Sequence, residues 1–221
     1  MKYLIPFIML LLLSACGSET DANRELVPSD ALEVRPLLVG MEVPDVEFRD
    51  INNKIVDLRK EIEKKPTAII YYRGGWCPYC NKHLAELKDI EDELYDLGIR
   101  ILAISPDTPQ FLSETLAEHQ IGYRLLSDAD MNGAKKFGIA FRLQRETVER
   151  YKENGLDLTE RSANNHNLLP VPSVFLADTD GSIFFQYVNP NYKVRISSDL
   201  LLAAAKELAK HHSENQASVV D

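Results

Sequence analysis

The chain has 221 residues, of which 45% are hydrophobic and 27% are charged. This is enough apolar material for one well-buried core, and the charged fraction is ordinary for a folded protein, so the composition excludes wholesale disorder. The net charge of −9 argues against nucleic acid as the main partner, because phosphate binding needs a basic face. Three cysteines, an odd number, exclude a fully paired set of disulfides within one chain.

The first residues combine one positive charge with a short apolar run. Lys2 precedes eleven apolar residues from Tyr3 to Leu13, and small residues lead to Cys16. The run fits a signal peptide and is shorter than the ~20 residues that a membrane-spanning helix needs. The four residues ending at Cys16 resemble a bacterial lipobox, in which this cysteine is lipidated and becomes the mature N-terminus. The alternative is an ordinary secretory peptide that is cleaved nearby.

These features predict how the chain is divided. We expect a lipoprotein signal peptide over residues 1–15 and a lipidated Cys16 that begins a flexible, polar tether over residues 16–36. Gly17 in place of Asp resembles an outer-membrane signal, which implies attachment to the cell envelope on the periplasmic side. One domain is expected over residues 37–213, with an insertion at 144–168 near the active face, followed by a polar tail at 214–221.

Strand-like and helix-like segments alternate along the domain. Apolar, β-prone runs predict strands at residues 54–58, 67–72, 99–105, 123–126, 173–177 and 183–188, and the last two flank a hairpin turn. Periodic or capped segments predict helices at residues 77–98, 108–119, 130–137, 144–152 and 200–208. The alternation predicts an α/β fold whose central sheet is mixed, mostly parallel, and covered by helices on both faces.

Cys77 and Cys80 lie where a buried strand turns through two glycines into a helix. The first turn of a helix has unpaired N–H groups and a positive end, which stabilise the thiolate of Cys77. Pro78 suits that turn, and Cys80 is one turn further, within reach of a disulfide. A purely structural disulfide is one alternative, but so short a ring removes little loop entropy. A metal site that includes His83 is another, but structural zinc needs a fourth ligand. The pattern favours thiol redox chemistry without a metal.

The segment from Tyr71 to Cys80, YYRGGWCPYC, resembles the peroxiredoxin-like members of the alkyl hydroperoxide reductase / thiol-specific antioxidant family. The resemblance continues at residues 104–107, 126–130, 169–175 and 187–195, and it covers about 39–208. It implies a thioredoxin-like fold in which Cys77 is the nucleophile, Cys80 resolves, and the redox-active disulfide replaces any cofactor. It also implies an electron donor, either a thioredoxin-like protein or a membrane reductase.

Four other residues are expected to support the dithiol. Trp76 is expected to form a wall beside it, and Arg73 to add positive charge. Val171 and Pro172 resemble the cis-proline pair of thioredoxins, which presents its backbone to a substrate chain. The alternative is a proline that opens an edge strand.

The chain departs from typical peroxiredoxins at the peroxide pocket. Gly74 and Ile70 stand where those proteins have a threonine or serine and a proline, and Pro172 stands at the position of their arginine. Arg73, Arg142 and Arg195 are possible substitutes for that arginine.

Two enzymatic functions therefore remain open, and both use Cys77 and Cys80. The first is an extracytoplasmic oxidoreductase that reduces disulfides of partner proteins. The second is a thioredoxin-dependent peroxidase that reduces hydrogen peroxide or alkyl hydroperoxides. A third class is a lipoprotein that only binds a metal or a partner. An arginine in contact with Cys77 would favour the peroxidase, and the absence of such a contact would count against it.

Overall fold

The computed structural model describes residues 27–218, so the predicted signal peptide, Cys16 and the first part of the tether lie outside the described residues. The strands are β1 (Glu47–Arg49), β2 (Ile55–Asp57), β3 (Thr67–Tyr71), β4 (Arg100–Ser105), β5 (Arg124–Ser127), β6 (Ala140–Arg142), β7 (Leu168–Pro170), β8 (Ser173–Ala177) and β9 (Ile183–Val188). The helices are η1 (Ala31–Glu33), α2 (Leu58–Ile62), α3 (Pro78–Asp89), α4 (Glu91–Asp96), α5 (Pro109–His119), α6 (Asn132–Lys136), α7 (Arg145–Glu153), α8 (Leu158–Ser162) and α9 (Ser198–Ser218).

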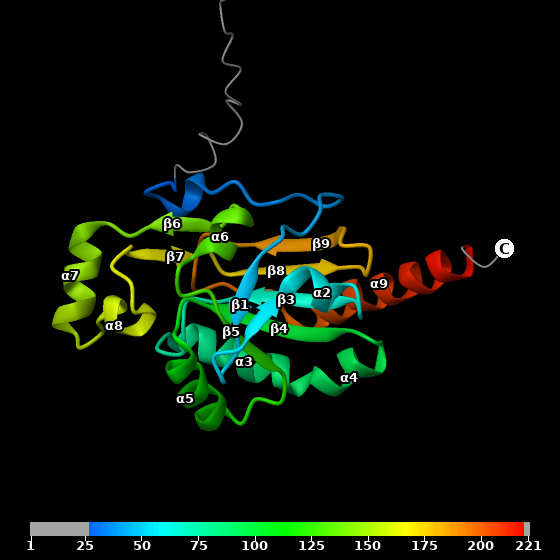
Figure 1. Cartoon of the computed structure of the whole chain (residues 1–221), viewed down its shortest axis with the longest axis horizontal. Helices are drawn as coiled ribbons and strands as arrows, with labels where there is room; N and C mark the ends of the chain where they lie inside the picture. Colours follow the sequence, from blue (N-terminus) through cyan, green and yellow to red (C-terminus); the bar gives the residue numbers. More distant parts are fainter. Residues whose placement is uncertain (1–26, 219–221) are drawn as a thin grey trace, which may run out of the picture.

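Within this part of the chain, seven strands form a mixed sheet in the order β2-β1-β5-β4-β3-β8-β9. The mixed sheet with helices on both faces confirms the predicted fold class, although fewer pairs are parallel than predicted (Figure 1). Only β3–β4 and β4–β5 are parallel pairs in the described residues. The reason is that antiparallel elements border both sides of this centre, with β8 and β9 beside β3 and the β1–β2 hairpin beside β5.

Both faces of the sheet are buried, which explains the continuous apolar runs of its central strands. In β3, Ala68 and Ile70 point into one core, which α3, α4, α5 and α9 cover. Ile69 and Tyr71 point into the other core, with α2, α6 and the segment that precedes β1. Alternate side chains of one strand serve opposite faces, so a strand between two cores needs apolar residues throughout.

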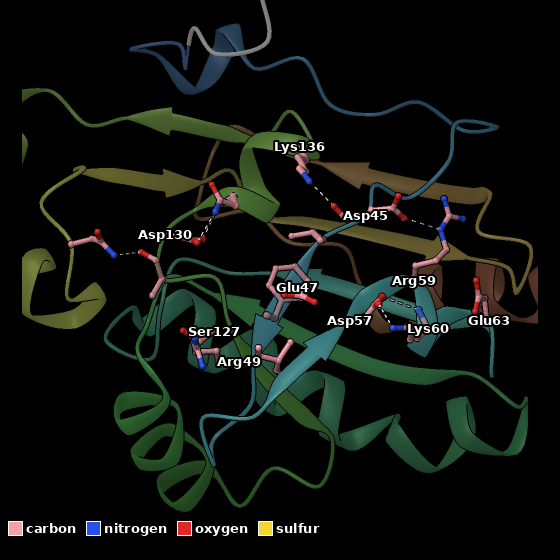
Figure 2. A pocket seen from close by; sticks show the side chains of 16 residues that line it. Asp45, Glu47, Arg49, Asp57, Arg59, Lys60, Glu63, Ser127, Asp130 and Lys136 are labelled. Atoms are coloured by element: carbon pink, nitrogen blue, oxygen red, sulfur yellow. Dashed lines mark hydrogen bonds and ion pairs between the residues drawn. The ribbon is translucent and has the colours of Figure 1, made fainter. Parts of the chain in front are cut away.

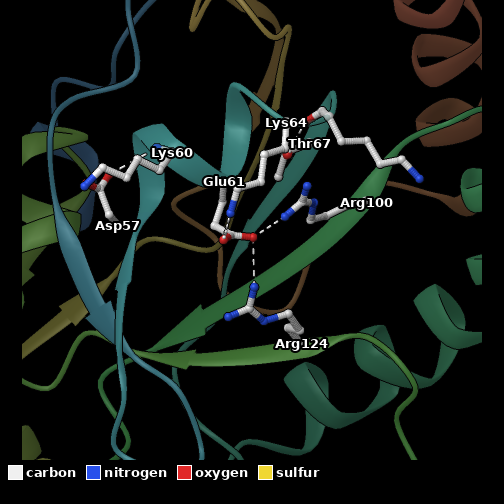
Figure 3. Close-up of polar contacts among 8 residues, drawn as sticks. Asp57, Lys60, Glu61, Lys64, Thr67, Arg100 and Arg124 are labelled. Atoms are coloured by element: carbon white, nitrogen blue, oxygen red, sulfur yellow. Dashed lines mark hydrogen bonds and ion pairs between the residues drawn. The ribbon is translucent and has the colours of Figure 1, made fainter.

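An ion-pair network ties α2 to the sheet (Figure 3). Glu61 of α2 accepts hydrogen bonds from Arg100, at the start of β4, and from Arg124, at the start of β5, the latter at 2.9 Å. Lys64 adds a third contact at 2.8 Å. Glu61 therefore joins the first residues of two neighbouring parallel strands to the helix above them.

Two predicted helices have different limits in the structure. The helix expected at 77–98 is divided into α3 and α4 at Ile90, whose φ of −111° and ψ of 7° are not helical. Ile90 ends α3 and precedes α4, and its side chain remains in the core, so the apolar spacing survives the break. The last helix continues well past residue 208, to Ser218, so the whole described part of the predicted tail is helical.

The described end of the predicted tether is packed rather than free. The Pro28 carbonyl accepts a hydrogen bond from the Arg142 backbone at 2.7 Å, and the Ser29 carbonyl accepts one from Gln144 at 3.0 Å. Val27 and Val34 pack against the second core. The prediction of a tether is therefore wrong for residues 27–36, because their apolar side chains and carbonyls find partners on the domain.

The insertion at 144–168 contains α7 and α8, and α7 lies within one residue of the predicted helix. Its two ends are joined by the β6–β7 ribbon, which the sequence did not predict (Figure 1). No helix among residues 27–218 is both long enough and apolar enough to cross a membrane.

Candidate active site

The two cysteines lie at the start of α3, as the sequence predicts. Cys77 is the N-cap residue and Pro78 is the first helical residue. The Cys77 N–H donates to the Gly74 carbonyl at 3.1 Å, and the Cys77 carbonyl accepts from the backbone of Cys80 at 2.9 Å. Both thiols are free, and the residues are only 1% and 0% exposed. The dithiol is thus held by helix-start hydrogen bonds beneath the protein surface.

The environment makes the two sulfurs unequal. A hydrogen bond from the Cys80 thiol lowers the pKa of Cys77 to about 6 against the effect of burial, and the charges of Arg73 and Arg195 also lower it. Burial raises the pKa of Cys80 well above its ordinary value, and the neighbouring Cys77 charge raises it further. Near neutral pH the two cysteines therefore carry one negative charge between them, and it lies on the sulfur of Cys77.

Arg73 lies directly before the glycine turn and is buried among aromatic rings. Its guanidinium carbon is 4.2 Å from the ring centre of Tyr192 and 5.0 Å from that of Trp76. It also donates to the Tyr151 hydroxyl of α7 at 2.7 Å. The insertion and the loop after β9 thus hold the Arg73 charge beside Cys77, and Trp76 forms part of this wall.

Arg195 reaches the dithiol from the loop between β9 and α9. One guanidinium nitrogen, Nη2, lies 3.3 Å from the sulfur of Cys80. Arg142, in contrast, donates from β6 to the His166 carbonyl at 2.6 Å and belongs to another part of the surface. Of the three arginines that the sequence offered, the structure brings Arg73 and Arg195 to the site.

A buried carboxylate that sequence reasoning missed anchors the glycine turn. Asp107, just after β4, accepts the Gly75 N–H at 2.7 Å and two hydrogen bonds from Arg161 of α8, each at 2.9 Å. Gly75 has no room for a side chain, because a Cβ atom there would lie 2.0 Å from the Thr115 hydroxyl oxygen. The strand pattern held a signal for Asp107. The ends of neighbouring parallel strands meet at one edge of the sheet, and there β3 leads to the glycine turn and β4 leads to Asp107.

The expectation of a cis proline is wrong. No cis peptide bond occurs among the described residues, so the Val171–Pro172 bond is trans. The Val171 N–H donates to the Ile139 carbonyl at 2.8 Å, and its carbonyl accepts from the Ser173 hydroxyl at 2.7 Å. Both polar groups of this backbone unit therefore already have partners inside the protein.

His83 and the cysteines do not form the metal site considered above. In the described part of the chain, no three His, Cys, Asp or Glu side chains come close enough to hold a metal ion. His83 is buried, and burial, followed by the charge of Arg195, lowers its pKa to about 4. This histidine is therefore neutral at physiological pH.

A large hollow is lined by residues other than the dithiol (Figure 2). It has a volume of about 970 Å³ and is lined mainly by polar and charged residues of both signs from β1, β2, α2 and the start of α6. Several of these groups neutralise one another, for example Lys60 with Asp57 at 3.0 Å and Arg59 with Asp45 at 3.5 Å. No cysteine lines it, so this hollow is not where the thiol chemistry occurs.

Comparison with known proteins gives the family of this chain. The AhpC/TSA family profile matches residues 39–186. Peroxiredoxin Bcp of Escherichia coli K12 is 28% identical over 106 residues, which are 48% of this chain and 67% of that protein. The thiol-disulfide oxidoreductase ResA of Bacillus thuringiensis is 20% identical over 199 residues, covering 90% of this chain and 95% of ResA.

The fold is also found in solved structures. Reduced Prx3 from Vibrio vulnificus, in complex with H2O2, matches with a TM-score of 0.63 at 15% identity, over 76% of this chain and 99% of that one. At this identity the likeness concerns the fold alone. The family profile, however, covers more than half of the chain. The chain therefore belongs to the AhpC/TSA family, within the thioredoxin superfamily, and is a thiol-based oxidoreductase.

Proposed function

We propose that this protein is a thiol peroxidase in which Cys77 attacks a peroxide and Cys80 resolves the product. The observation that carries the proposal is the position of Cys77, which is 1% exposed and lies within the field of two guanidinium groups, those of Arg73 and Arg195. Arg195 makes its hydrogen-bond contact with Cys80, so it is the burial of Cys77 and the charges of the two arginines, rather than a direct contact, that favour the second of the two enzymatic functions.

The burial of Cys77 favours a peroxide over a protein disulfide as its oxidant. A disulfide in a partner protein must bring two sulfurs and their backbone up to the attacking thiolate. With Cys77 1% exposed and the Val171 backbone already bonded, the described conformation offers no obvious place for that chain. A peroxide presents only two reacting oxygens, so it needs far less space.

The charges around Cys77 suit peroxide reduction. In this reaction, negative charge moves from the sulfur to the departing oxygen. Arg73 is held by the Tyr151 hydroxyl and by ring contacts, so its charge is in place before the reaction begins. The two arginines stabilise the thiolate first, and they then stabilise the charge that develops on the leaving oxygen.

The reaction balances with the two thiols and one external reductant. The Cys77 thiolate bonds to one peroxide oxygen, the O–O bond breaks, and the other oxygen leaves as an alcohol or water once it has gained a proton. Cys77 is then a sulfenic acid. Cys80 attacks it as a thiolate, a disulfide forms, and the sulfenic oxygen leaves as water with the proton that Cys80 has lost. An external dithiol is oxidised to restore both cysteines, so no bound cofactor is required.

Disulfide reduction is the second candidate function, and it is supported by the C-x-x-C spacing and by the likeness to ResA across most of the chain. We also propose that the enzyme works outside the cytoplasm, anchored through a lipidated Cys16 on the periplasmic side of the outer membrane. In those oxidising surroundings the electron donor is a thioredoxin-like protein or a membrane reductase.

The rate at which peroxide oxidises the reduced protein distinguishes the two functions. Trp76 is the only tryptophan in the sequence and lies beside the dithiol, so its fluorescence reports oxidation. We expect hydrogen peroxide or cumene hydroperoxide to react at least ~10²-fold faster than with free cysteine. Cys77→Ser should abolish the reaction, whereas Cys80→Ser should stop at the sulfenic acid, which dimedone traps.

The opposite outcome is equally specific. A rate with both peroxides no faster than that of free cysteine would refute the peroxidase. Reduction of insulin disulfides that is lost in Cys77→Ser would then establish the second candidate.

A further inference from the structure

We propose that Arg195 is a positioning residue for the resolving step, and that its guanidinium prepares Cys80 to attack the oxidised Cys77. This inference rests on the proposed two-thiol function, and it assigns to Arg195 a task distinct from the stabilisation of the attacking thiolate. It begins with a contact between segments 115 residues apart in the sequence, the 3.3 Å approach of Arg195 Nη2 to the sulfur of Cys80.

The loop that carries Arg195 holds the guanidinium in place. The other terminal nitrogen, Nη1, donates to the carbonyls of Tyr192 and Val194, the latter at 2.9 Å. Directly after Arg195, Ile196 is buried in the core beneath α9. The side chain is thus tied to its own loop, and the loop is tied to the core. This leaves Nη2 directed at the sulfur.

Cys80 needs such a partner because its surroundings oppose ionisation. The residue is 0% exposed, and burial raises its pKa well above the ordinary value. The species that attacks a sulfenic acid is the thiolate, so an unassisted buried thiol would react slowly. His83, one turn further along the same helix, is kept neutral and supplies no positive charge. Arg195 is the cationic side chain in hydrogen-bond contact with this sulfur.

Oxidation of Cys77 changes the electrostatics in favour of this role. In the reduced protein, the Cys77 thiolate shares the field of Arg195 and its negative charge opposes ionisation of Cys80. When Cys77 becomes a sulfenic acid, it is neutral. The repulsion disappears, and the charge of Arg195 is left to act on Cys80 alone. One fixed guanidinium therefore serves the two sulfurs in succession. The proton of Cys80 leaves with the sulfenic oxygen as water, and the step needs no further reactant.

The test separates the two chemical steps in the full enzyme. In Arg195→Met, we expect disulfide formation after oxidation to slow by at least ~10-fold, because a hydrogen bond to a charged group is lost. The formation of the sulfenic acid should slow by a smaller factor. Dimedone should trap more sulfenic acid, and irreversible oxidation should begin at lower peroxide concentrations. Arg195→Lys keeps the charge and should recover most of the resolving rate.

The matched control is Arg142→Met, which removes a guanidinium from β6 outside the site and should leave both steps unchanged. If Arg195→Met slowed sulfenic acid formation and left disulfide formation unchanged, Arg195 would belong to the peroxide step and the inference would be overturned.

A second measurement uses no peroxide. In Cys77→Ser, the ultraviolet absorbance of the thiolate reports the titration of Cys80, and adding Arg195→Met should raise its midpoint by about one pH unit. An unchanged midpoint would contradict the inference even in an active peroxidase. A raised midpoint in a protein that fails the peroxide test would instead reject the peroxidase and keep the role of Arg195 for a mixed disulfide.

Discussion

Asp107 and Arg161 form a buried ion pair at the site. Of the polar contacts there, we expect the loss of one partner of this pair to lower the free energy of unfolding most. The Asp107 side chain is fully buried and that of Arg161 is 17% exposed. Burial raises the pKa of Asp107 in spite of Arg161, so the desolvation of the carboxylate outweighs the attraction. Such a pair adds little net stability, but removing one partner leaves the other charge buried alone, at a cost of about 3–5 kcal/mol.

The two single variants should therefore differ. Asp107→Ala strands the Arg161 guanidinium and the Gly75 N–H, so we expect it to lower the free energy of unfolding by about 4 kcal/mol. Arg161→Met should cost less, because Asp107 can be protonated and lose its charge. The double variant should cost at least ~2 kcal/mol less than the sum of the single variants, as expected for groups in direct contact.

Urea denaturation followed by the fluorescence of the single tryptophan measures all three variants. The exposed Asp45, whose side chain is 88% accessible, provides the control, and Asp45→Ala should change the stability by less than ~0.5 kcal/mol. If the losses in Asp107→Ala and Arg161→Met simply added within ~0.5 kcal/mol, the two side chains would not be coupled. That result would refute both the pair and its role in anchoring the glycine turn.

Three further outcomes follow from the described contacts. Because the Cys77 pKa is about 6 and the thiolate is the reactive form, the rate with peroxide should rise with pH through about 6 and then level; a midpoint near that of free cysteine would contradict this. Glu61→Gln should lower the free energy of unfolding by about 1–2 kcal/mol. The pKa of Glu61 is lowered in the folded state, so the difference from the wild type should vanish as pH falls through that pKa, and a difference that persists in acid would reject the network in Figure 3. Gly75→Ala should slow Cys77 oxidation by displacing the turn, and adding Thr115→Ala should restore part of the rate; no loss in Gly75→Ala would show that the turn has room.

Much of the fold and the centre of the site followed from local sequence signals. The apolar run of β3, the glycines after it, and a cysteine followed by proline placed the dithiol at the start of a helix, where the structure has it. The sequence also predicted which side chains of α3 and α4 face the core, although it did not predict the break between the two helices at Ile90. The helix predicted at 200–208 was shorter than α9, because the last turns of α9 are polar and show no apolar periodicity.

The surroundings of the dithiol were less predictable. The sequence placed Arg73 near the dithiol, but it did not show which of Arg73, Arg142 and Arg195 replaces the missing peroxiredoxin arginine, since spacing does not show which loops meet. It suggested a cis bond at Pro172, but the bond before Pro172 is trans. The N–H of the preceding Val171 donates to Ile139 within the domain. The role of Asp107 was also missed, because its partner Arg161 lies in α8, in the part of the insertion for which the sequence predicted no helix.

The sequence by itself determined the alternation of the main strands and helices, the family resemblance, and the two thiols at a helix start. These depend on hydrophobic period, turn chemistry and capping, which act over a few neighbouring residues. Only the tertiary structure decided which charges face those thiols. Arg73 meets Tyr151 across 78 residues of sequence, Asp107 meets Arg161 across 54, and Arg195 meets Cys80 across 115. Such contacts form when distant segments pack on one sheet, and that packing converts a local C-x-x-C motif into a buried site with one ionised and one protonated sulfur.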